Sequence, residues 1–274
     1  MPVYRAAGEV SAACSAPAAR GPIHCAPVCI AVADMSESIR LARRVAEIAG
    51  CSRSEAEQYI QGGWVRVDGR IVELPQHPVS SETVSLAPDA RLDAVEPAIL
   101  LLHKPPGLDV FNDAAALAAC IEPAAQWDGD ASGVRRLHRH FHRLQPLVPL
   151  DREASGLIVL TQDGRVRRRL TEDLSAIEQE FVVEVDGALA PWGLARLNHG
   201  LEFEGRKLPP GKVSWQNEVR LRFALKGVRP GQLQAMCAQV GLQVVSIRRL
   251  RIGRVSLAKM PVGAWRYLPV GERF

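Results

Sequence analysis

The sequence predicts an α+β protein built from two units, and four observations lead to that prediction. An apolar stripe with helical spacing begins after Ser38, a second helix with its own start signal follows, and a hairpin signal comes next. Apolar runs of strand length, separated by polar helical stretches, then continue from Ile99 to the end of the chain. The length of 274 residues allows two modest domains, and the hydrophobic share of 47% is enough to build a core.

The first unit, residues 38–95, is expected to combine two helices with a small sheet. Its first helix is predicted by apolar residues at helical spacing, which are Leu41, Val45, Ile48 and Ala49. The second helix begins with a capping box formed by Ser52 and Glu55. Asp68-Gly69 between two β-type runs is a strong hairpin signal, and a further strand is expected over residues 83–86.

Residues 1–37 are rich in Ala, Pro and Ser and show no periodicity, so we expect a disordered leader, or a true start at Met35. No apolar run is long enough for a membrane span, and no secretion signal is present. The six cysteines form no C-x-x-C pair, which favours a reduced, cytoplasmic protein. His24 with Cys25 and Cys29 is a weak metal candidate, because no matching second pair follows.

The net charge of +4 is small, but the arginines are concentrated in two stretches. Residues 135–169 contain nine arginines against three acids, and residues 241–271 contain six basic residues and no acid. Such stretches are typical of surfaces that contact polyphosphates, since each cation that meets a phosphate releases counterions. The alternative is a basic face that is only solvated.

The second unit, residues 98–274, is expected to begin with a buried strand at Ile99 and to contain a short helix over residues 114–120. Leu137, Phe141 and Leu144 predict an amphipathic basic helix over residues 134–144. Three histidines lie in that stretch, but no carboxylate or cysteine stands near them to complete a metal shell. We therefore expect surface or RNA-facing histidines at His138, His140 and His142.

The strongest candidate for chemistry is Asp151. It follows an apolar residue and precedes a glycine turn that leads into the apolar run Leu157–Leu160. A carboxylate on a loop that a buried strand holds in place is well positioned for a reactive group. Spacing alone does not separate this arrangement from an aspartate that only forms a turn.

The first unit resembles an S4 RNA-binding domain. The resemblance rests on Arg40-Leu41, on residues 50–56 (GCSRSEA) and on residues 60–69 (IQGGWVRVDG). It implies that the two helices and the following strand present basic side chains to RNA, and the candidates are Arg40, Arg43, Arg44, Arg53 and Arg66.

Residues 149–164 (PLDREASGLIVLTQDG) are similar to the signature R-L-D-x-x-x-x-G-L-[LI]-[LV]-L-T-x-D-G of pseudouridine synthases. Further blocks follow the family order, at residues 102–107 (LHKPPG), 178–185 (EQEFVVEV) and 236–266. With the S4-like unit in front, the chain resembles rRNA pseudouridine synthases of the RsuA/RluB/RluF type. The resemblance implies a second domain built on a mixed, largely antiparallel sheet with flanking helices.

The resemblance also implies the activity. A specific uridine in ribosomal RNA would be flipped out and converted to pseudouridine by a monomer that needs no cofactor and no metal. Asp151 would act as the nucleophile and Phe181 would stack on the base. Among the basic residues of the second unit we expect RNA contacts from Lys104, Arg152, Arg248 and Arg251.

Three positions depart from the family pattern: Pro149 and Gln234 replace arginines, and Phe181 replaces a tyrosine. Without a counter-charge a desolvated carboxylate tends toward its protonated form. Arg229 or Lys226 is a possible substitute for the arginine that the family places beside its aspartate. The alternative function is therefore a degenerate homologue that binds structured RNA or assists ribosome assembly without catalysis.

Overall fold

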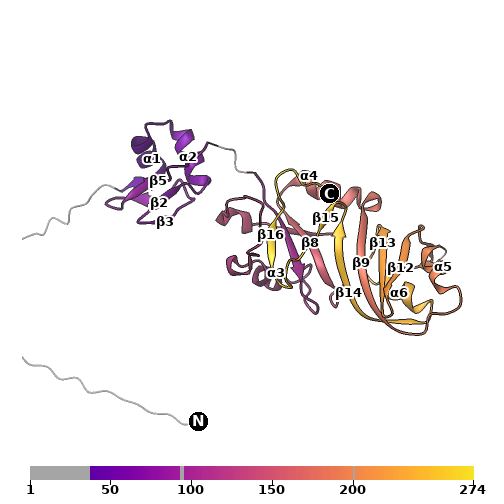
Figure 1. Cartoon of the computed structure of the whole chain (residues 1–274). Helices are drawn as coiled ribbons and strands as arrows, with labels where there is room; N and C mark the ends of the chain where they lie inside the picture. Colours follow the sequence, from indigo (N-terminus) through magenta and orange to yellow (C-terminus); the bar gives the residue numbers. More distant parts are fainter. Residues whose placement is uncertain (1–37, 93–95, 200) are drawn as a thin grey trace, which may run out of the picture. The chain divides into compact units, whose positions relative to one another are not determined.

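The computed structural model describes residues 38–92, 96–199 and 201–274 (Figure 1). The predicted leader and the Cys25–Cys29 candidate lie outside the described residues. Among the described helices none has the length and apolar character that crossing a membrane requires.

The first segment contains the two predicted helices, α1 (Leu41–Ala49) and α2 (Arg53–Gln61). The capping box is confirmed, since the Ser52 hydroxyl accepts from the Glu55 N–H and the Glu55 carboxylate accepts from the Ser52 N–H. Ile48 was expected in the apolar stripe but is 53% exposed, so that part of the prediction is wrong. Ala49 is exposed as well, so the buried stripe of α1 consists of Leu41, Ala42 and Val45.

Short strands complete this segment. β2 (Val65–Val67) pairs with β3 (Arg70–Ile71) and β5 (Val84–Leu86), and β1 (Ile39–Arg40) pairs with β4 (Pro78–Val79). Asp68 and Gly69 both have positive φ, 47° and 78°, which is the geometry of the tight hairpin turn that the sequence predicted.

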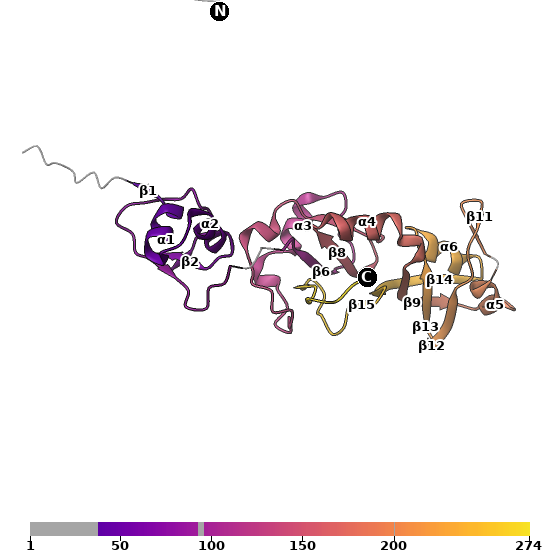
Figure 2. The ribbon, with the colours of Figure 1, turned by 90° about the horizontal axis from the view of Figure 1, so that it is seen from above.

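The second segment is built on a nine-stranded sheet. Its main path runs β12 (Lys212–Asn217), β13 (Arg220–Lys226), β9 (Glu178–Gly187), β14 (Leu242–Ile252), β8 (Ser155–Thr161), β6 (Ile99–Lys104) and β16 (Trp265–Tyr267). β7 (Gln145–Leu147) pairs with β8, and β15 (Val255–Ser256) pairs with β14. Only β14 and β8 pair in parallel, so the sheet is mixed and largely antiparallel, as expected. Figure 2 shows the long strands of this sheet from above.

The central strands are buried on both faces. Along β8, Ile158 and Leu160 pack into one hydrophobic cluster, whereas Leu157 and Val159 pack into another. This two-sided burial explains why residues 157–160 form an unbroken apolar run rather than an alternating one.

Short helices flank the sheet. They are α3 (Ala114–Cys120), α4 (Gly164–Glu172), α5 (Gly193–Asn198) and α6 (Gln232–Ala238), with 3-10 turns η1 (Pro123–Ala125), η2 (His138–Phe141) and η3 (Leu174–Ala176), and a small hairpin of β10 (Glu202–Phe203) and β11 (Arg206–Lys207). The helix predicted over residues 114–120 is confirmed, and Asp113 caps it by accepting from two backbone N–H groups.

The basic helix predicted over residues 134–144 is wrong, because only η2 is helical there. The backbone angles account for this result, because Leu137 before η2 and His142 after it are both extended, with φ of −121° and −91°. The Gln162 side-chain amide, which donates to the carbonyl oxygens of Arg139, at 2.7 Å, and of His142, holds this irregular turn in place. Arg143 has a φ of 55°, which also ends any right-handed helix at that residue.

Candidate active site

Asp151 lies in the loop before β8, and its carboxylate is held by two donors from the start of α6. The backbone N–H of Gly231 donates to Oδ1 at 2.9 Å, and the Gln234 side-chain amide donates to Oδ2 at 3.1 Å. Gly231 has a φ of 75°, a left-handed conformation that glycine adopts without strain. The carboxylate is therefore fixed in one orientation by residues 80 and 83 positions away.

Neither candidate counter-charge pairs with Asp151. Arg229 pairs instead with Glu204 at 2.6 Å and lies over the ring of Phe203. Lys226 is exposed at the end of β13, opposite Glu178 on β9. In the described part of the chain no basic side chain lies within 4 Å of the Asp151 carboxylate. The neutral amide of Gln234 occupies the place beside the carboxylate, and its Oε1 is buried without a hydrogen-bond partner.

Arg249 on β14 lies behind the Asp151 loop and was not among the residues that the sequence pattern singled out. Its side chain is fully buried and donates to the carbonyls of Leu157 at 2.7 Å, Pro149 at 3.1 Å and Val148 at 2.8 Å, and to Gln179 Oε1 at 3.2 Å. Burial lowers the pKa of this guanidinium to about 9, and the charge of Asp151 opposes that shift. The only sequence signal for it was its place in the basic run at residues 248–251.

Arg249 thus fixes the two residues that precede Leu150 and Asp151, and it contributes positive charge from behind the loop. Gly156 makes this close packing possible. A Cβ at Gly156 would collide with the backbone N and O of Arg249, and its φ of 120° is unsuited to other residues. The glycine of the D-x-x-x-x-G motif is therefore required by the approach of β14 to the start of β8.

The space beside Asp151 is small. A cavity of about 10 Å³ is bounded by Asp151, Phe181 and residues 228–230, among others. Phe181 is only 2% exposed and forms part of the apolar wall. This volume holds roughly one water molecule. A flat base enters only if the wall moves, and Gly227 and Gly231, both at positive φ, border the wall segment.

Lys104 has a position different from the expected one, because its side chain is fully buried rather than facing RNA. Its ammonium group donates to the carbonyls of Pro105 at 2.9 Å, Leu108 at 2.9 Å and Arg152 at 2.7 Å. Burial lowers its pKa to about 8. Lys104 therefore connects the turn at residues 104–108 to the loop that carries Asp151, because it donates to two carbonyls of the turn and to one of the loop.

The other expected RNA-binding residues lie on the surface or near it. Arg152 is exposed and donates to the Gly107 carbonyl at 2.9 Å, whereas Arg251 is half-buried and pairs with Glu178 and Glu180. In the first segment, glutamates of the same helix pair with Arg43, Arg44 and Arg53. Arg40, Arg66 and Arg248 are exposed. RNA binding by these residues stays a prediction.

The histidine cluster divides into two kinds. His138 and His142 are exposed and their rings are 4.9 Å apart. His140 is buried, contrary to expectation, and its Nδ1 lies 3.0 Å from the hydroxyl of Tyr267. Burial lowers the pKa of His140 to about 4. Within the described ranges no group of three or more potential ligands could hold a metal ion.

Comparison with known proteins finds similar sequences that cover both segments. The family model described as the S4 domain matches residues 37–85. The dual-specificity RNA pseudouridine synthase RluF of Escherichia coli K12 is 26% identical over 239 residues, which are 86% of this chain and 77% of that protein. The ribosomal large subunit pseudouridine synthase B of Bacillus subtilis is 26% identical, covering 85% of this chain and 93% of that protein.

A further relative is the ribosomal small subunit pseudouridine synthase A of Salmonella typhimurium, which is 27% identical and covers 80% of this chain and 91% of that protein. Among solved structures, a pseudouridylate synthase covers 84% of this chain and 96% of its own, with 23% identity and a TM-score of 0.53. That likeness shows the fold. The resemblance drawn from the sequence motifs is confirmed over most of the chain.

Proposed function

We propose that this chain, a homologue of RNA pseudouridine synthases with an S4 domain at its N-terminal side, isomerises a specific uridine of ribosomal RNA to pseudouridine. The relatives are named for this reaction and are similar over most of the chain. The observation that carries the proposal is the Asp151 carboxylate, which Gly231 and Gln234 hold at the edge of an apolar wall.

The chemistry follows from this arrangement. A base leaves its stack and enters beside Phe181, whose ring gives an apolar surface for stacking. The Asp151 carboxylate attacks or stabilises the electron-poor sugar while the N-glycosidic bond breaks. The uracil then turns and its C5 carbon joins the sugar as the carboxylate is released. The freed Asp151 carboxylate takes the C5 proton and passes it to water, and N1, which has lost its bond to the sugar, takes up a proton. Two fixed hydrogen bonds orient the oxygens of Asp151 so that one of them faces the reacting carbon.

Arg249 and Phe181 surround the Asp151 loop and have different roles in this scheme. Arg249 supplies a positive charge behind the loop, although it forms no ion pair with Asp151. Phe181 has no hydroxyl, so it contributes packing and no proton transfer. We infer that the reaction needs no metal or cofactor, since the Asp151 carboxylate serves first as the nucleophile and then as the base for the C5 proton.

The two segments have separate roles in this proposal. Residues 38–95 form the S4 RNA-binding domain, with Arg40, Arg43, Arg44, Arg53 and Arg66 as its contacts, and residues 98–274 form the catalytic domain. Arg152 and Arg248 lie on its exposed surface and are available to phosphates. We expect a monomer that acts in the cytoplasm, where ribosomal RNA is made.

Tritium release tests the proposal. Unmodified ribosomal RNA labelled with tritium at uridine C5 is incubated with the wild type and with Asp151→Asn. The wild type should release tritium and the variant should not, while both bind the RNA equally in a filter assay. Binding without release by the wild type would refute the isomerase and support the alternative, an RNA-binding homologue without catalysis.

A further inference from the structure

A second and larger hollow lies at the other end of β8. Asp151 precedes β8, whereas the hollow is lined by Thr161 at its end and by residues of the 139–145 loop and of α4. Its volume is about 510 Å³. The seven residues of β8 span roughly 20 Å at about 3.3 Å each, so this hollow is separate from the cavity beside Asp151.

One wall of the hollow is held in place by Gln162. Its side-chain amide donates to the carbonyls of Arg139 and His142. The next residue, Arg143, has a φ of 55°, a conformation that non-glycine residues rarely adopt unless the surroundings impose it. Arg139 and Arg143, which both line the hollow, are thus placed by contacts across two elements.

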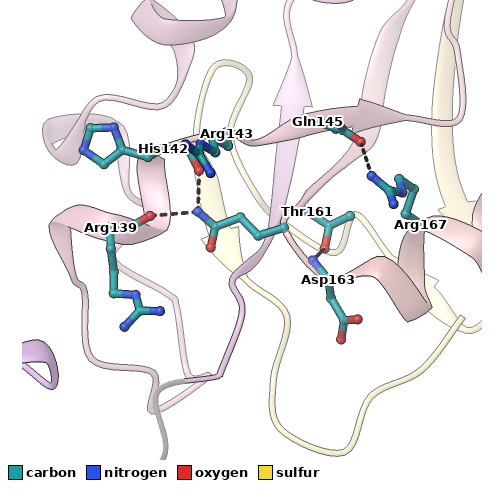
Figure 3. Close-up of a pocket in the computed structure, with 8 residues that line it drawn as sticks. Arg139, His142, Arg143, Gln145, Thr161, Asp163 and Arg167 are labelled. Atoms are coloured by element: carbon teal, nitrogen blue, oxygen red, sulfur yellow. Dashed lines mark hydrogen bonds between the residues drawn. The ribbon is translucent and has the colours of Figure 1, made fainter. Parts of the chain in front are cut away.

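The arginines that line the hollow form no ion pairs with the described carboxylates, whereas the other arginines of α4 do. Arg165, Arg168 and Arg169 pair with Asp163, Glu172 and Asp173, respectively. Arg167 lines the hollow and bonds only to the neutral side chain of Gln145, at 3.2 Å (Figure 3). Among the described residues no carboxylate lies within 4 Å of the guanidinium groups of Arg139, Arg143 or Arg167.

One acid, Asp163, also lines the hollow. Its carboxylate accepts from the Arg165 N–H at 2.7 Å and lies 3.7 Å from the Arg165 side chain. It acts as the N-cap of α4, so its charge is largely compensated by the helix start and by Arg165. Three arginines from two elements therefore face one opening with an excess of positive charge.

We propose that this hollow binds backbone phosphates of the RNA, at nucleotides other than the one that meets Asp151. The planar guanidinium forks of Arg139, Arg143 and Arg167 match phosphate oxygens, and such contacts set the register of an RNA without reading its bases. The hollow is an anchor for the same RNA, so this inference rests on the proposed function. Its position a strand length from Asp151 lets it hold a flanking part of the RNA while the target base enters the catalytic loop.

The test compares two variants of equal charge change. Arg143→Gln with Arg167→Gln removes two arginines of the hollow, and Arg168→Gln with Arg169→Gln removes two that are paired on the same helix. Affinity for unmodified ribosomal RNA is measured by filter binding over a range of salt, in an Asp151→Asn background. This readout needs no turnover, so it is independent of whether the protein isomerises uridine.

In the hollow variant, the negative slope of log affinity against log salt should become shallower by about 1.4 to 1.8, which corresponds to the loss of two phosphate contacts. The control variant should change the slope by less than about a third of that. Equal losses in both variants would show a general charge effect and overturn the proposal, as would an unchanged slope in the hollow variant. Arg143→Lys with Arg167→Lys should keep most of the slope, and a loss with normal thermal stability would contradict phosphate contact.

Discussion

Replacing Gln234 by methionine tests the catalytic arrangement most directly. The substitution keeps the length of the side chain and removes the amide that donates to Asp151 Oδ2 at 3.1 Å. A hydrogen bond to a charged group contributes about 1.5 to 3 kcal/mol. If Gln234 orients the carboxylate in the transition state, the single-turnover rate of tritium release should therefore fall by roughly 10- to 150-fold.

Stability should change much less than the rate. Methionine removes the hydrogen bond to Asp151 and also the Gln234 Oε1 acceptor, which is buried without a partner, so the two effects oppose each other. We expect a Tm within a few degrees of the wild type. Gln239→Met at the C-cap of the same helix is the matched control, because Gln239 donates to the Glu202 carbonyl and not to Asp151. A rate within twofold of the wild type, or an equal loss in the Gln239 variant, would refute the role given to Gln234.

Three further predictions concern stability. Gly156→Ala should lower the free energy of unfolding in urea by at least about 3 kcal/mol, because the added Cβ collides with the Arg249 backbone. Gly164→Ala at the start of α4 is the control and should change the free energy of unfolding by no more than about 1 kcal/mol. Equal effects of the two substitutions would contradict the packing of Gly156 against Arg249. Arg249→Met should cost about 3 kcal/mol or more, since three carbonyls lose their donor, and an unchanged urea midpoint would show that the guanidinium is not needed. The wild type should lose stability as the pH falls from about 6.5 to about 4, because the unfolded chain protonates His140 first. The pKa shift to about 4 corresponds to an effect on the order of 3 kcal/mol, and His140→Gln should flatten the pH profile by that amount.

Local patterns led to correct predictions wherever neighbours in the chain decide the structure. Ser52 and Glu55 cap a helix through atoms three residues apart, and Asp68-Gly69 closes a hairpin through its own backbone angles. The strand after Asp151 was also predictable, since burial on both faces needs an unbroken apolar run. The basic helix over residues 134–144 failed because Leu137 and His142 have extended backbone angles on either side of η2, and the amide of the distant Gln162 holds that turn through the carbonyls of Arg139 and His142.

In the candidate site, too, the sequence predicted what neighbouring residues decide and missed what distant residues decide. The motif around Asp151 identified the loop and its aspartate from residues that lie together in the chain. It did not identify Arg249, which reaches the Val148 and Pro149 carbonyls from about 100 positions away. The sequence suggested that Lys104 is a surface cation, but its side chain is buried and its ammonium group donates to three backbone carbonyls.

The sequence alone therefore determined the α+β class, the order of the units and the aspartate on which the proposed chemistry depends, because these follow from periodicity, turn chemistry and contiguous motifs. Only the tertiary structure decided what stands beside that aspartate. The choice among Arg229, Lys226 and Gln234 depends on how α6 meets the loop before β8, and the approach of those elements is set by packing between residues that are far apart in the chain.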